Sequence, residues 1–145
     1  MTHDSHIIVG GAPEGYDAQL LIKELLLANG PVMHVARDDK RLAAMAEAIC
    51  FFAPDIPVLQ FPSWDCLPYD RISPQADISA ARMATLATLV HKAPERFILL
   101  TTLNAVTQKI PQRAILKDSV FRATVGKKMN EAASVSYTHL RAHET

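Results

Sequence analysis

Short apolar runs that end in glycine, proline or polar residues alternate along this chain with segments whose apolar residues recur every three or four positions. The short runs are typical of buried strands, and the longer periodicity is typical of amphipathic helices. Strands are predicted at about residues 6–10, 31–36, 57–61 and 97–102. Alternation of strand and helix favours a parallel sheet, because parallel strands need a crossover between them. The predicted fold class is therefore a three-layer α/β unit with a mainly parallel sheet and helices on both faces.

The first helix is expected to follow the strand at residues 6–10. Asp17 precedes an apolar segment and is assigned as the N-cap of a helix over residues 18–27. Residues 29–31, Asn-Gly-Pro, end that helix, with Gly30 in a left-handed turn. Because the polar face of this helix is narrow, we expect it to be covered on most sides.

A second helix is expected to begin at Asp38 or Asp39 and to end before Pro54. Its apolar residues recur at three- and four-residue steps, which predicts one buried face made of Leu42, Met45, Ile49 and Phe52. Cys50 is assigned to the apolar side as a small core residue. Two further helices are predicted over residues 78–90 and 104–109.

Length and composition narrow the class of protein. With 145 residues, 49% of them hydrophobic, the chain is long enough for one domain with a substantial core. It has no apolar run of the roughly twenty residues that a membrane span needs, and its start does not resemble a secretory signal. Its two cysteines do not make a disulfide framework. We therefore expect a cytoplasmic protein without membrane contact.

The charges are unevenly distributed, although fifteen basic and fifteen acidic residues give a formal net charge of zero. Between residues 109 and 128, Asp118 is the sole acid beside the basic residues Lys109, Arg113, Lys117, Arg122, Lys127 and Lys128. Basic patches bind phosphate groups, so Lys127 and Lys128 are candidate contacts to DNA or to a partner. A solvated surface near a domain edge has the same composition, and both interpretations stay open.

The turn between the first strand and the first helix has the glycine spacing of a phosphate-binding loop. Gly10 and Gly15 are separated by four residues, but Tyr16 and Asp17 stand where such a loop needs lysine and then serine or threonine. Pro13 also removes one backbone N–H from the cradle that would hold the phosphates. We therefore interpret the turn as a vestigial phosphate loop in a degenerate P-loop, helicase-like fold, with no functional cofactor site. An independent small P-loop enzyme is the alternative.

Catalytic and metal-binding motifs are absent from the sequence. The six histidines do not converge with other ligands at the spacing of a metal site, so no metal is expected. Cys66 has no neighbouring lysine or histidine to activate it as a nucleophile. No catalytic residue is assigned.

The segment from residue 62 to residue 74 is the most distinctive in the chain. It combines the single tryptophan with three prolines and several charges, and loops that follow strands of an open parallel sheet commonly carry functional groups. The candidate interaction residues are Trp64, Asp65, Tyr69, Asp70 and Arg71. The alternative is that the aromatic residues plug the sheet edge while the prolines stiffen a connector, and both can hold.

Three segments carry a family resemblance. The most specific is the run Trp-Asp-Cys-Leu-Pro-Tyr-Asp-Arg at residues 64–71, and residues 35–42 and 99–108 are the others. Together they closely resemble bacterial transcription-repair coupling factors (Mfd), and the resemblance extends from about residue 7 to residue 131. The N-terminal module of that family is in turn similar to UvrB of nucleotide excision repair, and a UvrB-type helicase fragment is a further alternative.

The resemblance implies a multi-domain, ATP-driven translocase on double-stranded DNA that displaces stalled RNA polymerase and recruits UvrA. ATP and Mg²⁺ would bind in motor domains outside this chain, so the chain itself would be a scaffold module and not an enzyme. Residues 1–114 would form the first α/β subdomain, and residues 115–133 would begin the UvrA-interaction subdomain. The segment that follows Tyr69 is also too short for the hairpin with which UvrB clamps DNA.

The last twelve residues, 134–145, share no periodicity with the rest of the chain. They resemble the translation of a sequencing adaptor, a string that recurs at the ends of unrelated predicted proteins. We therefore expect an artefactual tail on a gene that was truncated in assembly, and we assign these residues no part in the fold.

Overall fold

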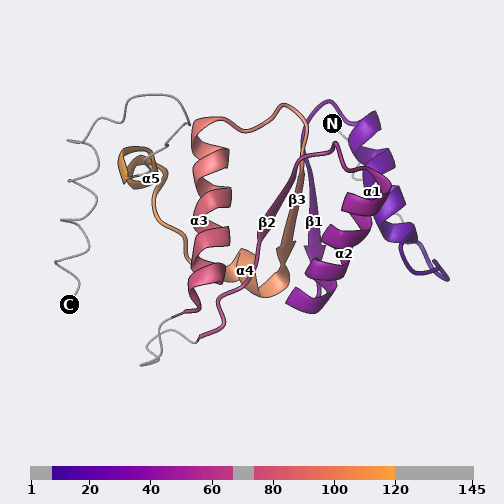
Figure 1. The fold of residues 1–145 in the computed structure, drawn as a ribbon, viewed down its shortest axis with the longest axis horizontal. Helices are drawn as coiled ribbons and strands as arrows, with labels where there is room; N and C mark the ends of the chain where they lie inside the picture. Colours follow the sequence, from indigo (N-terminus) through magenta and orange to yellow (C-terminus); the bar gives the residue numbers. More distant parts are fainter. Residues whose placement is uncertain (1–7, 67–73, 120–145) are drawn as a thin grey trace. The chain divides into compact units, whose positions relative to one another are not determined.

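The computed structural model describes residues 8–66 and 74–119 (Figure 1). In chain order the elements are α1 (Tyr16–Leu27), β1 (Val32–Ala36), α2 (Asp39–Phe52), β2 (Val58–Phe61), α3 (Ala76–His91), β3 (Ile98–Thr102), α4 (Leu103–Thr107) and α5 (Arg113–Ser119). The chain forms two compact units. The first contains residues 1–85 and 94–108, and the second contains residues 86–93 and 109–145.

The first unit is built on a parallel sheet whose strand order is β1-β3-β2. Val32 of β1 and Val58 of β2 both stand opposite Ile98 of β3, so the two outer strands flank the central strand in the same register. In Figure 1, α1 and α2 lie on one side of the sheet, and the first part of α3 lies beside β2 on the other. The predicted α/β class with a parallel sheet and helices around it is confirmed.

The prediction of a strand at residues 6–10 is wrong for residues 8–10, which are the part that the structure describes. Residues 8–10 are outside any strand, and the side chains of Ile8 and Val9 are 84% and 52% exposed. Residues 6 and 7 lie outside the described residues. An apolar run becomes a strand only when a neighbouring strand accepts its hydrogen bonds, and residues 8–10 pair with none of the three strands of the described sheet.

The core of the first unit lies between the sheet and the two helices α1 and α2. Its buried residues are Ala18, Leu25, Ala36, Leu42, Met45, Ile49, Ile98 and Leu100. Three of the four residues predicted for the apolar face of α2 are therefore buried, while Phe52 is exposed. Cys50 is also exposed, so its assignment to the core is wrong. Consecutive helical residues differ by about 100° in direction, which turns Cys50 away from the core that Ile49 enters.

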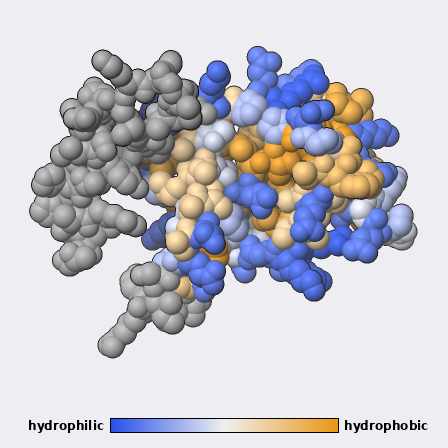
Figure 2. All heavy atoms as spheres, viewed as in Figure 1, coloured by the Kyte–Doolittle hydropathy of each residue, from blue (hydrophilic) through white to orange (hydrophobic). Residues whose placement is uncertain are grey.

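The helix α1 is less covered than predicted. Leu26 and Leu27 are exposed, although both follow the buried Leu25. Figure 2 shows apolar atoms at the surface over α1 and α2. A single sheet and one neighbouring helix cover only part of the circumference of a helix, so the width of its apolar face does not determine how much of it is buried.

The first turn of α1 also differs from the prediction. Its N-cap is Gly15, at φ 82° in the left-handed region, and Asp17 lies one residue inside the helix. At the other end Gly30 does not have a positive φ. Pro31 follows it, and a residue before proline is restricted to extended conformations, which explains why the left-handed turn does not form.

The remaining elements agree closely with the sequence pattern. Asp38 is the N-cap of α2, and its Oδ1 accepts a hydrogen bond of 2.8 Å from the backbone N–H of Arg41. The helices α3 and α4 occupy nearly the predicted segments, while α5 was not predicted. The predicted subdomain boundary near residue 114 stays a prediction. Among the described residues, no helix has the length and apolar character required to cross a membrane.

Candidate functional site

In the turn that leads into α1, two backbone N–H groups have partners within the chain. The backbone N–H of Tyr16 donates to the carbonyl oxygen of Pro13 at 3.1 Å, and that of Ala18 donates to Oδ1 of Asp17 at 3.0 Å. A phosphate loop works because such N–H groups point at the ligand. Here two of these N–H groups are hydrogen-bonded before any ligand arrives.

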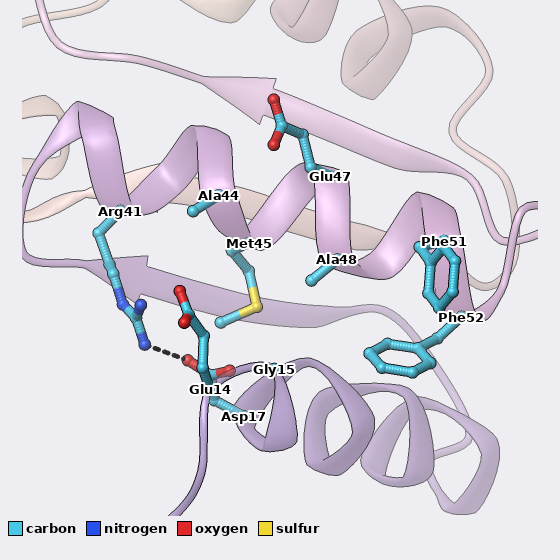
Figure 3. A pocket seen from close by; sticks show the side chains of 10 residues that line it. All are labelled: Glu14, Gly15, Asp17, Arg41, Ala44, Met45, Glu47, Ala48, Phe51 and Phe52. Atoms are coloured by element: carbon cyan, nitrogen blue, oxygen red, sulfur yellow. Dashed lines mark hydrogen bonds and ion pairs between the residues drawn. The ribbon is translucent and has the colours of Figure 1, made fainter.

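An ion pair lies at the same helix end. Oδ2 of Asp17 is 2.8 Å from Nη2 of Arg41, which reaches across from α2 (Figure 3). The Asp17 carboxylate lies near the positive end of the α1 dipole, and Arg41 supplies the opposite charge. A bound phosphate would face this carboxylate at close range, and it would compete with Asp17 for the guanidinium.

His34 of β1 lies within the electrostatic influence of this ion pair. Its imidazole is half-buried, and burial lowers the pKa of His34 below the usual value of 6.5. The negative charge of Asp17 raises this pKa and the positive charge of Arg41 lowers it, both to a smaller extent than burial does. The neutral form of His34 is therefore favoured in the folded chain.

A groove of about 360 Å³ lies between the turn and α2 (Figure 3). Its lining residues are Glu14, Gly15, Asp17, Arg41, Ala44, Met45, Glu47, Ala48, Phe51 and Phe52. Figure 3 shows Arg41 at one end of this groove and the two phenylalanine rings at the other. The glycine spacing predicted the turn, whereas the α2 side of the groove was not predicted from the sequence.

A second cluster surrounds Arg82 of α3, whose side chain is 2% exposed. Its Nη1 donates to the carbonyl oxygen of Pro62 at 2.6 Å and to Oε1 of Gln108 at 3.1 Å. The guanidinium carbon lies 4.0 Å from the ring centroid of Phe61 and 4.4 Å from that of Trp64. Desolvation by burial lowers the pKa of Arg82, but a guanidinium keeps its charge in proteins.

This cluster fixes the beginning of the distinctive segment at residues 62–74. The backbone N–H of Trp64 donates to Oε1 of Gln108 at 3.0 Å, and Ser63 donates both its N–H and its hydroxyl to the carboxylate of Asp39. Further along, the carboxylate of Asp65 accepts from the backbone N–H of Gln75 at 3.3 Å. This bond links Asp65 to the residue that directly follows the segment.

Of the predicted interaction residues, the structure brings Trp64 to this cluster and places the carboxylate of Asp65 against the backbone N–H of Gln75. Tyr69, Asp70 and Arg71 lie outside the described residues. Arg82 was not among the residues predicted from the sequence. A signal was present, because Arg82 is the single charged residue between positions 78 and 90 of an otherwise apolar and small-residue helix. Such a residue needs a partner when the helix is packed.

Two other predictions are not tested by the described residues. Lys127 and Lys128 lie outside them, so a contact of the basic stretch with DNA or a partner stays a prediction. Within the two described ranges, no three side chains of the metal-ligating types converge. The absence of a metal from the whole chain likewise stays a prediction.

No family model matches the chain. Among curated proteins, the transcription-repair-coupling factor of Escherichia coli is 27% identical over 117 residues, which cover 77% of this chain. That of Haemophilus influenzae is 27% identical over 126 residues, covering 87% of the chain, and that of Rickettsia prowazekii is 27% identical over 81 residues, covering 56%.

These relatives are much longer than the chain. The matched part amounts to 10% of the Escherichia coli protein, 11% of the Haemophilus influenzae protein and 7% of the Rickettsia prowazekii protein. The matches do not favour the alternatives of a UvrB-type fragment or an independent small P-loop enzyme. They confirm the resemblance predicted from the motifs, and the chain is similar over most of its length to a fragment of the transcription-repair-coupling factors.

Proposed function

We propose that this chain is a non-catalytic scaffold module of a transcription-repair-coupling factor, which links stalled RNA polymerase to UvrA-directed excision repair in the cytoplasm. The similarity to three proteins of that name supports the general role in transcription-coupled repair. ATP and Mg²⁺ then act in other domains of the longer protein. UvrA, RNA polymerase and double-stranded DNA are the partners of the whole protein, and Lys127 and Lys128 are the contacts proposed within this chain.

The observation that carries the non-catalytic part of the proposal is the ion pair between Asp17 and Arg41 at the start of α1. A phosphate loop needs a lysine charge and free N–H groups at this place. Here Tyr16 brings no charge, and the N–H of Ala18 is taken by Asp17. The carboxylates of Glu14 and Asp17 add negative charge where the phosphates would lie.

Calorimetric titration of ATP·Mg²⁺ into the full chain tests this proposal. We expect no measurable binding heat and no hydrolysis, because the binding determinants of a phosphate loop are missing. The variant Tyr16→Lys/Asp17→Thr restores the two absent residue types, and Tyr16→Lys alone, which keeps the ion pair, is its control. Micromolar binding by the unmodified chain would contradict the proposal and revive the small-enzyme alternative.

A further inference from the structure

We draw no further inference here: the strongest candidate, the groove between α2 and the turn that leads into α1, where the side chain of Phe51 is 81% exposed, is a partly exposed apolar face, and nothing among the described residues shows what covers it.

Discussion

At the scale of single residues, Arg82 is the charged residue that is most deeply buried among the described residues, at 2% exposure. Transfer of a charged side chain out of water is costly unless hydrogen bonds and nearby opposite charge offset it. Arg82 meets two neutral oxygen acceptors and the faces of two aromatic rings. Rings attract cations through their quadrupole, and more strongly when the site is dry. The guanidinium therefore joins α3 to the strand β2 and to the segment that follows it.

The first prediction is that Arg82→Ala lowers the free energy of unfolding by about 3 kcal/mol. The variant removes both hydrogen bonds, and it leaves the acceptors on Pro62 and Gln108 without this donor. Urea denaturation followed by circular dichroism measures the change. Arg82→Lys should lose less, because it keeps the charge but lacks the planar fork. Arg37→Ala is the control, since that side chain is 89% exposed, and equal losses at Arg82 and Arg37 would contradict the prediction.

The second prediction concerns the pH dependence that His34 confers. Burial lowers the pKa of His34 in the folded chain, so the unfolded chain, at about 6.5, binds the proton more tightly. Stability from this residue is therefore fully present above pH 6.5 and is lost as the pH falls towards the folded pKa. Thermal melts between about pH 7.5 and pH 5 should show a declining midpoint.

The variant His34→Gln should flatten this decline, because glutamine does not titrate. His91→Gln, at an exposed histidine near the end of α3, is the matched control for the substitution itself. An unchanged slope in His34→Gln, or an equal flattening in both variants, would show that another group carries the pH dependence.

At the scale of elements, the start of α1 shows how a turn determines which residue caps a helix. Gly15 lies at φ 82°, and a Cβ added there would come within 3.5 Å of the Phe52 ring. A side chain at this φ costs energy whatever space surrounds it. The third prediction is that Gly15→Ala lowers the free energy of unfolding by about 1–2 kcal/mol.

Gly10→Ala is the matched control for this prediction. Gly10 does not have a positive φ, and a Cβ there would meet nothing within 4 Å. Its substitution should change stability by less than about 0.5 kcal/mol. Urea midpoints compare the two variants directly, and a loss at Gly10 as large as that at Gly15 would refute the role of the left-handed turn.

The bounds of the strands and of α2 show which features a local sequence pattern predicts correctly. The strands β1, β2 and β3 and the helix α2 coincide closely with the predicted segments, since runs of apolar residues and capping residues such as Asp38 act within a few positions of the chain. The N-cap assignment of Asp17 failed for the opposite reason. Both Gly15 and Asp17 are acceptable caps, and the choice was made by the left-handed turn and by Arg41, which lies 24 positions away.

At the scale of the whole molecule, β3 organises the first unit because it alone pairs on both edges within the described sheet. Ile98 and Leu100 are fully buried, and Thr101 and Thr102 nearly so. Backbone N–H groups of a central parallel strand bond alternately to either neighbour, whereas an outer strand directs half of them away from the sheet. The stability of the unit should therefore be highest at this strand.

The fourth prediction is that the amides of β3 exchange with solvent more slowly than those of β1 and β2. Opening of β3 requires loss of both strand pairings and of the core, which approaches global unfolding. Hydrogen exchange followed by mass spectrometry or NMR measures this order. Residues 8–10, outside any strand and exposed, provide the fast-exchanging reference. Slower exchange in an outer strand would contradict the central role of β3.

Local patterns in the amino-acid sequence predict the fold class, three of the four proposed strands, most of the buried face of α2 and the family resemblance. Each depends on residues close together in the chain, such as the three- and four-residue spacing of Leu42, Met45 and Ile49. Three features emerge only from the folded chain: residues 8–10 are not in a strand, Cys50 is exposed, and Arg82 contacts both Phe61 and Trp64. These outcomes depend on partners distant in the sequence, and burial, hydrogen bonding and cation–π contact act between residues that only folding brings together.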